Sequence, residues 1–234
     1  NNKYLIIDEA QRINDIGLKL KLIIDQKLDV QIIATGSSSL DLNNQVSESL
    51  AGRKREFKMF PLSFKEMSSH TNLLEEIRMI PHRMIYGYYP EVVTNPGDEK
   101  TILKELTDSY LYKDCLAFDS IKKSDKIITL AKALAMQIGN QISYSEIGQI
   151  VGLESKTTEK YINILEQCYI VFRLGSYAKN LRNELKNSKK IYFWDLGIRN
   201  AIMGNFNPTD NRTDIGEMWE NFVIAERLKN KNYL

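Results

Sequence analysis

Two short, predominantly apolar segments, residues 4–8 and 30–34, lie near the start of the chain. Between them, from about residue 15 to residue 25, apolar side chains recur at helical spacing, at Ile16, Leu20, Ile23 and Ile24. Strands that are buried on both faces of a helix-covered parallel sheet read as continuous apolar runs. The pattern therefore predicts two buried parallel strands joined by a helix, with a third short strand at residues 57–60.

The pattern becomes helical from residue 63 to about residue 113, where prolines at 81, 90 and 96 interrupt it. The apolar residues spaced for amphipathic helices are Phe64, Met67, Leu73, Leu74, Ile77, Met84 and Ile85. We interpret this stretch as a helical lid or connector.

Three further helices and two strand-like runs follow. We expect the helices at residues 125–139, 143–151 and from about 155, and the runs at 169–174 and 190–194. Ser143 and Glu146 have the spacing of a capping box, and Ser155 is the expected N-cap of the third helix. The residues expected to face inward on that helix are Tyr161, Ile164, Leu165 and Cys168. Three helices and a β-hairpin in this order are typical of a winged helix-turn-helix.

A final helix is expected at residues 216–229, with an apolar face made of Trp219, Phe222, Val223 and Leu228. The predicted fold class is α/β, in four parts. They are a partial parallel-sheet core at residues 1–62, a helical lid at 63–120, a winged helix at 121–195 and the start of a further α/β domain at 196–234.

Composition changes this picture little. The chain is 43% hydrophobic and 26% charged, as is ordinary for a globular protein, and 32 basic against 30 acidic residues indicate no particular partner. No apolar stretch approaches the roughly 20 residues of a membrane-spanning helix. Cys115 and Cys168 form no disulfide framework, and with two histidines the chain offers no zinc spacing. We expect a cytoplasmic protein with no membrane partner.

The candidate chemistry lies where the two strands end. Asp8 and Glu9 follow the first strand, and Thr35 follows the second, at the edge where open α/β sheets bind their ligands. Asp8 would hold Mg²⁺, Glu9 would polarise a water for in-line attack, and Thr35 would contact the γ-phosphate or that water. The alternatives are a solvated acidic turn for Asp8 and Glu9, and a Ser/Thr turn for Thr35.

Two features bear on this nucleotide hypothesis. Arg53, in a basic triplet, could offer charge to phosphate, in cis or in a neighbouring subunit of a homo-oligomer; a solvated basic loop is the commoner interpretation. The glycine-rich loop G-x-x-x-x-G-K-[ST] that cradles phosphates occurs nowhere in the 234 residues. Because the chain also begins Asn1-Asn2-Lys3 with no Met, we interpret it as an internal part of a longer protein.

The winged helix carries a second set of candidates, basic and hydroxyl side chains that could meet DNA phosphates. On the third helix and in the wing they are Lys156, Thr157, Thr158, Lys160, Lys179, Arg182, Lys186, Lys189 and Lys190. Many winged helices bind only protein, and Glu154, Glu159 and Glu184 dilute the basic face. DNA binding and protein binding both stay open.

Motifs along nearly the whole chain resemble those of prokaryotic AAA-type ATP-binding proteins whose carboxy-terminal half is a domain of unknown function. LIIDEAQ (5–11) resembles the Walker B segment of that family, and TGSS (35–38) is similar to its sensor segment. SLAGR (49–53) and FPLSFKE (60–66) resemble the signature that closes the ATPase core. The further matching segments are GYYPEVV (87–93), KIYFWDLG (190–197) and GEMWENFV (216–223).

The resemblance implies binding and hydrolysis of ATP with Mg²⁺, with Asp8 and Glu9 in the roles given above and Arg53 matching an arginine of the family. The last domain of the family is similar to restriction-endonuclease-like folds, which places Glu220 at the position of their first acidic residue. Without the phosphate-cradling loop, we expect this chain by itself to bind ATP weakly or not at all. The alternative is a DNA- or protein-binding winged-helix module in which the ATPase remnant is only a scaffold.

Overall fold

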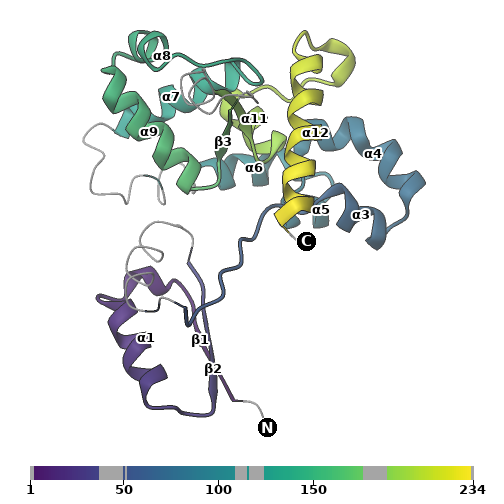
Figure 1. Ribbon diagram of the computed structural model, residues 1–234. Helices are drawn as coiled ribbons and strands as arrows, with labels where there is room; N and C mark the ends of the chain where they lie inside the picture. Colours follow the sequence, from purple (N-terminus) through teal and green to yellow (C-terminus); the bar gives the residue numbers. More distant parts are fainter. Residues whose placement is uncertain are drawn as a thin grey trace, which may run out of the picture. The chain divides into compact units, whose positions relative to one another are not determined.

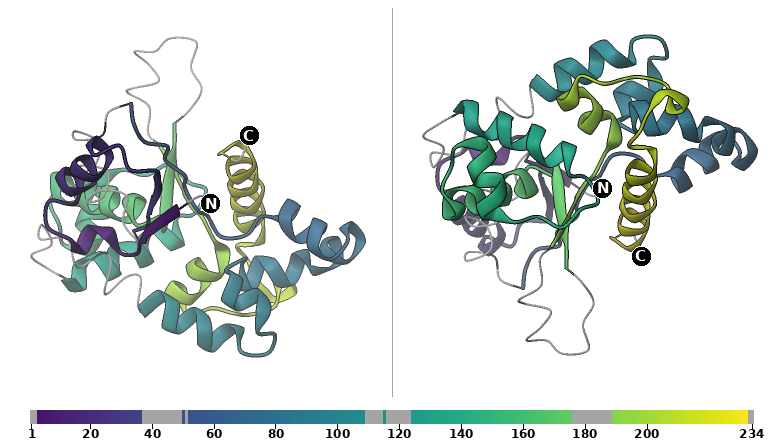
Figure 2. Two further views of the ribbon diagram at one scale, coloured as in Figure 1. Left: turned by 90° about the horizontal axis from the view of Figure 1, so that it is seen from below. Right: turned by 90° about the horizontal axis from the view of Figure 1, so that it is seen from above.

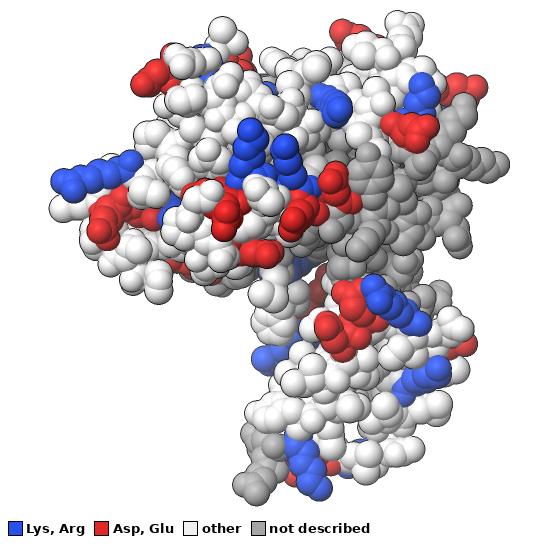
Figure 3. Space-filling view, turned by 180° about the vertical axis from the view of Figure 1, so that it is seen from behind, with Lys and Arg blue, Asp and Glu red and all other residues white. Residues whose placement is uncertain are grey.

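The computed structural model describes residues 3–36, 50, 52–108, 115, 124–175 and 189–232. The chain divides into two compact units, Asn1–Lys58 and Met59–Leu234 (Figure 1). Figure 2 gives two further views of the elements of each unit. Basic and acidic side chains are interspersed on the surface shown in Figure 3, as the near balance of 32 basic and 30 acidic residues leads one to expect.

The amino-terminal unit has the predicted strand, helix and strand. They are β1 (Lys3–Ile7), α1 (Ile16–Asp25) and β2 (Val30–Ala34), with a 3-10 turn, η1 (Ala10–Arg12), after β1. The two strands are parallel, with Lys3 opposite Val30 and Ile7 opposite Ala34. The apolar runs thus predicted both the elements and their relative direction.

The prediction that β1 is buried was wrong. Side chains alternate between the two faces of a strand, and Ile7, Ile32 and Ala34 pack with the buried residues of α1. On β1 itself, Tyr4 is 57% and Ile6 67% exposed. Among the described residues of this unit, the sheet is a single pair of strands with a core on one face.

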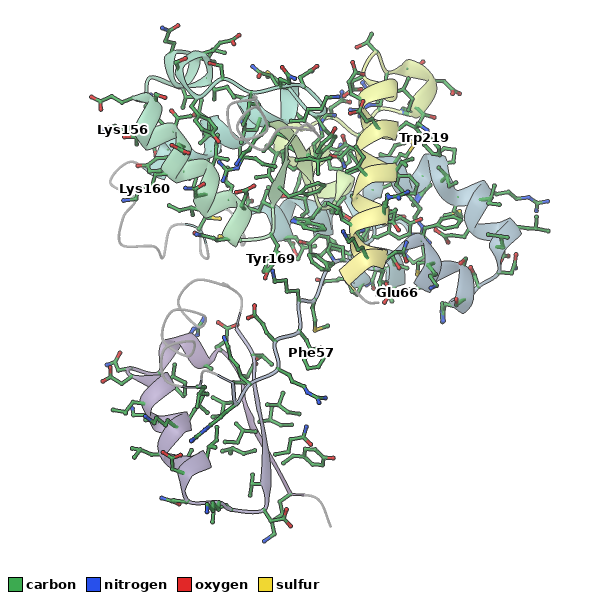
Figure 4. All side chains as sticks on the ribbon, in the orientation of Figure 1. Phe57, Glu66, Lys156, Lys160, Tyr169 and Trp219 are labelled. Atoms are coloured by element: carbon green, nitrogen blue, oxygen red, sulfur yellow. The ribbon has the colours of Figure 1, made fainter. Side chains whose placement is uncertain are left out.

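The third strand predicted at residues 57–60 is absent, because residues 54–60 have no regular secondary structure. Phe57 (Figure 4) and Met59 are 83% and 89% exposed. Among the described residues, the strands pair only as β1 with β2 and β3 with β4. This apolar segment therefore pairs with neither sheet of the described residues.

The second unit is mostly helical. Its elements are α3 (Phe64–His70), α4 (Leu73–Tyr86), α5 (Pro90–Thr94), α6 (Glu99–Asp108), α7 (Ser124–Met136), α8 (Tyr144–Val151), α9 (Ser155–Gln167), β3 (Val171–Leu174), β4 (Lys190–Phe193), α11 (Leu196–Met203), η3 (Thr209–Asn211) and α12 (Ile215–Asn232). No helix in the described ranges is both long enough and apolar enough to cross a membrane.

A large hydrophobic core runs through the second unit, beside a smaller cluster that contains Phe60, Phe172 and Trp194. Buried side chains from α4, α6, α7, α9 and α11 share the large core, among them Met84, Leu103, Leu130, Leu165 and Ile202. The predicted lid, winged helix and further α/β domain therefore share this core and do not each have one of their own. Among the described residues no strand follows β4, and residues 196–232 form α11, η3 and α12.

The order of three helices and a hairpin at α7–β4 is as predicted. β3 and β4 are antiparallel, with Val171 opposite Phe193. Ser143 caps α8 by accepting a hydrogen bond from the Glu146 N–H at 3.4 Å. Ser155, however, is the first residue of α9, and the residue at the N-cap is Glu154.

The buried face of α12 differs from the predicted apolar face. Trp219 (Figure 4) and Val223 are 47% and 45% exposed, whereas Asn221 and Lys229 are 1% exposed. Asn221 is held by a pair of hydrogen bonds to the backbone of Phe193, at 2.7 and 2.9 Å. Specific polar partners far away in sequence, which no helical period reveals, select the face that α12 buries.

Candidate functional site

The carboxyl ends of β1 and β2 bring together the side chains that the sequence placed there. The Thr35 N–H donates to the Ile7 carbonyl at 2.9 Å, and the Ala10 N–H donates to the Thr35 carbonyl at 2.9 Å. The Thr35 hydroxyl donates a hydrogen bond to Oδ1 of Asp8. Both Asp8 and Thr35 are exposed. A carboxylate and a hydroxyl thus meet at one solvent-facing edge of a parallel sheet.

Glu9 turns the chain sharply at this edge. It has φ 49° and ψ 43°, in the left-handed region that residues other than glycine seldom adopt. Its N–H lies 3.1 Å from Oδ1 of Asp8, and its carboxylate is 3.4 Å from the Arg12 guanidinium. Backbone strain of this kind is often found at functional sites, although Asp15, Lys27 and Tyr169 also have positive φ here.

The oxygen donors at this edge fit a hard cation such as Mg²⁺. No group of three or more His, Cys, Asp or Glu residues that could hold a metal occurs among the residues that the structure describes. Mg²⁺ usually takes only one or two protein carboxylates and completes its shell with phosphate and water. Asp8 and Thr35 could therefore supply oxygen ligands to a Mg²⁺ ion whose shell is completed by phosphate and water.

Arg53 is not brought to this edge. Its guanidinium donates to Oδ1 of Asp25 at 2.5 Å. Asp25 is the last residue of α1, which returns from the end of β1 toward the start of β2 (Figure 1). Ten helical residues span about 15 Å, so Asp25 marks the opposite end of the sheet from Asp8. Within this chain Arg53 therefore lies away from Asp8 and Thr35, and a contact with phosphate in a neighbouring subunit stays a prediction. Ser37 and Ser38 of the sensor-like segment lie outside the described residues.

The basic candidates on α9 have mixed positions. Lys156 and Lys160 are exposed and lie one turn apart (Figure 4), and Thr157 is partly buried. Thr158 was a wrong prediction, because it is 0% exposed and its hydroxyl donates to the Glu154 carbonyl at 3.0 Å. Two lysines of the predicted DNA surface thus remain available on this helix.

Two other candidate residues, Lys190 and Glu220, bind each other. The Lys190 ammonium and the Tyr192 hydroxyl both donate to Oε1 of Glu220, at 2.9 and 2.6 Å. The hydrogen bonds from Tyr192 and Lys190 lower the pKa of Glu220. Burial, together with the bond to Glu220, raises the pKa of Tyr192. Lys189 is exposed, and the wing positions Lys179, Arg182 and Lys186 fall outside the described ranges.

A buried polar cluster in the second unit was missed from the sequence. The Tyr88 N–H donates to Oδ2 of Asp195 at 2.7 Å, and the Ile198 N–H donates to Oδ1 of the same carboxylate at 3.1 Å. A Cβ at Gly87, which has φ +73°, would lie 2.0 Å from that Oδ1. The segments GYYPEVV and KIYFWDLG, which the sequence marked only as landmarks, therefore meet at Tyr88 and Asp195.

Tyr88 is the centre of this cluster. Its hydroxyl donates to Oε1 of Glu76 at 2.8 Å, and the same oxygen accepts from Nε of Arg83 at 3.0 Å. The Arg83 guanidinium and the Lys229 ammonium lie 5.3 and 5.4 Å from the centre of the Tyr88 ring. Burial, followed by the hydrogen bond to Glu76, raises the pKa of Tyr88. Arg83, Tyr88, Asp195 and Lys229 also line a pocket.

A second buried ionic group fixes α11. Arg199 donates to the Ala135 carbonyl at 3.0 and 2.8 Å and to Oδ2 of Asp214 at 2.6 Å. Arg212 donates to the same oxygen of Asp214 at 2.8 Å. Burial alone would raise the pKa of Asp214, but the bonds and charges of Arg212 and Arg199 lower it to about 2.

Comparison with known proteins divides the chain in a similar way. Residues 77–209 match the family described as "Domain of unknown function (DUF8612)", and residues 1–68 match the family described as "AAA domain". No solved structure matches the chain.

Three curated relatives, all described as uncharacterized proteins, align with nearly the whole chain. That of Haemophilus influenzae is 26% identical over 97% of this chain and 58% of its own length. That of Methanocaldococcus jannaschii is 25% identical over 97% and 53%, and that of Mycobacterium tuberculosis 23% identical over 95% and 50%. The chain therefore spans between half and three fifths of the length of these relatives.

Proposed function

This chain belongs to the DUF8612 family of domains of unknown function, and from that premise we propose that it is the part of an AAA-type ATPase that couples Mg-ATP to its carboxy-terminal unit. The family match covers residues 77–209, and the AAA match at residues 1–68 supports an ATPase-like region before it. The activity is that of the whole protein, since the relatives are nearly twice as long as the matched part.

The observation that carries the proposal is the pairing of Asp8 with Thr35 at the ends of two parallel strands. Asp8 would bind Mg²⁺ directly or through a water, and Thr35 would contact the γ-phosphate or the attacking water. Glu9 would orient and polarise that water for in-line attack. Bound Mg²⁺ would supply charge neutralisation at the phosphates.

The phosphates need a further set of donors. The 234 residues contain no G-x-x-x-x-G-K-[ST] loop, and Arg53 pairs with Asp25. We therefore place the phosphate-cradling backbone in residues of the full-length protein outside this chain. The chain alone should bind ATP only weakly, because the cation-binding edge by itself contacts little of the nucleotide.

Measurement of ATP turnover by the full-length protein tests the proposed roles. Replacing Glu9 by Gln should retain Mg-ATP binding and slow hydrolysis about 100-fold or more, as expected when a general base is removed. Asp29→Asn is the matched control, since Asp29 is an exposed carboxylate of the same unit that precedes β2, at the opposite end of that strand from Thr35. Wild-type turnover in Glu9→Gln would refute the assigned role.

We also propose that α7–β4 acts as a winged helix that binds DNA. The exposed pair Lys156 and Lys160, one turn apart on α9, favours this second role. Charge reversal at both positions should weaken DNA binding and flatten its salt dependence, by about 0.9 in the log–log slope for each lost phosphate contact. Lys132→Glu, at an exposed position of α7, is the control. An unchanged affinity and slope would leave protein binding as the alternative.

A further inference from the structure

Residues 60–64, here named the strap, are held against the second unit by contacts to their backbone. The Leu62 N–H donates to the Tyr88 carbonyl at 3.0 Å, and the Leu62 carbonyl accepts from the Lys229 ammonium at 3.0 Å. The Phe64 N–H donates to Oε2 of Glu226 at 2.6 Å. Three bonds within three residues therefore fix the path of the strap.

An aromatic contact fixes its first residue. Phe60, which is 9% exposed, stacks on Trp194 with ring centres 4.2 Å apart and contacts Tyr169 edge-on at 5.8 Å. At the other end, Ser63 forms a complete capping box with Glu66 and begins α3. The strap thus leads from exposed Met59 directly into a helix.

The charges that hold the strap are deeply buried. Lys229 is 1% and Glu226 8% exposed, and the Lys229 ammonium lies 2.9 Å from Oε1 of Glu226. Removing an ion pair from water carries a large desolvation penalty, which hydrogen bonds to the remaining donors and acceptors must offset. Here those bonds go to backbone atoms of a segment more than 160 positions away in sequence.

A continuous chain of bonds connects the strap to α11. Leu62 is bonded to the Tyr88 carbonyl, and the Tyr88 N–H is bonded to Asp195. Asp195 in turn caps α11 through the Ile198 N–H. A displacement of the strap would therefore act on the amino-terminal end of α11, a helix inside the core of this unit.

The strap belongs to one region by sequence and to the other by structure. The AAA match extends to residue 68, but the compact amino-terminal unit ends at Lys58. Residues 54–59, which lead into the strap, have no regular secondary structure. The end of the AAA-like sequence is thus folded into the second unit, where α12 binds it.

We propose that the strap is the element that transmits nucleotide-dependent movement from the AAA-like region to the carboxy-terminal unit, with Glu226 and Lys229 as its clamp. The inference rests on the ATPase function proposed above. Because the strap is bonded at Leu62 and Phe64, within four residues of residue 60, a pull on residue 60 must either move the clamp or break its bonds. Intact, the clamp passes the displacement through Tyr88 and Asp195 to α11.

The test uses the full-length protein carrying Glu226→Gln together with Lys229→Met. The double change removes both charges, so that neither is left buried without its partner, and it deletes the ammonium bond to Leu62. Lys231→Met, two residues further along α12 and exposed, is the matched control. Amide hydrogen exchange at Leu62, Phe64 and Ile198 is measured with and without Mg-ATP, and ATP turnover is measured in the same samples.

In the wild type and in Lys231→Met, Mg-ATP should change exchange about tenfold at all three amides. In the double variant, turnover should stay within about twofold of the wild type while the response of Ile198 is lost. An Ile198 response equal to that of the wild type, or no wild-type response during normal turnover, would overturn the proposal. Absence of turnover in the wild type would refute the ATPase function instead.

A second variant covers the case in which the double variant does not fold, as judged by circular dichroism. Phe60→Leu removes the stack on Trp194 without changing the buried charges. It should reduce the response of Ile198 to Mg-ATP in the same direction but by a smaller factor, with turnover retained. A full response in Phe60→Leu would also count against transmission through the strap.

Discussion

The carboxyl ends of β1 and β2 and the buried cluster around Tyr88 are built from the same types of side chain. At the first site, Asp8 is exposed and its carboxylate accepts a hydrogen bond from the Thr35 hydroxyl. In the second, Asp195 is 4% exposed and both of its oxygens accept backbone N–H groups. An exposed carboxylate at a strand end can still bind a cation, whereas a buried and fully bonded one fixes the positions of the segments that contact it.

The largest expected effect separates the two regions by stability. Lys229→Ala leaves Glu226 buried without its partner, so the free energy of unfolding of the second unit should fall by about 3–5 kcal/mol. Asp8→Asn, an exposed change, should alter the unfolding free energy of the first unit by less than about 0.5 kcal/mol. Urea denaturation of each variant measures both values. Equal losses would break the distinction between a structural cluster and a ligand site.

Gly87→Ala tests whether the cluster requires close backbone approach. Gly87 has φ 73° and ψ −159°, a conformation that is essentially restricted to glycine, and its added Cβ would collide with Asp195. We expect a loss of at least about 2–3 kcal/mol, from the strained backbone together with the clash.

Gly204→Ala is the matched control, since Gly204 has φ +65° and nothing within 4 Å of an added Cβ. It should cost only about 1–2 kcal/mol of backbone strain. The same urea titrations provide both values. If the two substitutions have the same effect, contact with Asp195 does not determine the residue at 87.

Acid should weaken the group around Asp214. Because its pKa is lowered to about 2, the charged form stabilises the fold above its ordinary pKa, and this stabilisation is lost as the pH falls from about 4 to 2. Asp214→Asn should lower stability near neutral pH by about 1–2 kcal/mol and should flatten the acid loss. Asp210→Asn, which is exposed, is the control. Parallel pH profiles of the wild type and Asp214→Asn would contradict this account.

The contrast also explains what could be predicted from the sequence. Local apolar periodicity was sufficient for β1, α1 and β2, and the parallel direction placed Asp8 beside Thr35. Periodicity failed for α12, because Lys229 is buried where its ammonium donates to the Leu62 carbonyl, 167 positions away in sequence.

Burial was misjudged for similar reasons. An apolar run does not state which face of a strand is covered, so the exposure of Ile6 could not be read from it. At the start of a helix, Thr158 looks like a phosphate ligand until its bond to the Glu154 carbonyl is seen. Such long-range or orientation-dependent contacts leave no periodic signal in the chain.

Calorimetric titration with ATP, with and without Mg²⁺, tests the central claim most directly. The full-length protein should bind Mg-ATP with micromolar affinity, and Asp8→Asn should weaken that binding about tenfold or more only when Mg²⁺ is present. The 234-residue chain alone should show no micromolar binding. Failure of the full-length protein to bind, or equal binding by the isolated chain, would contradict the assignment of the β1–β2 edge as one half of an ATP site.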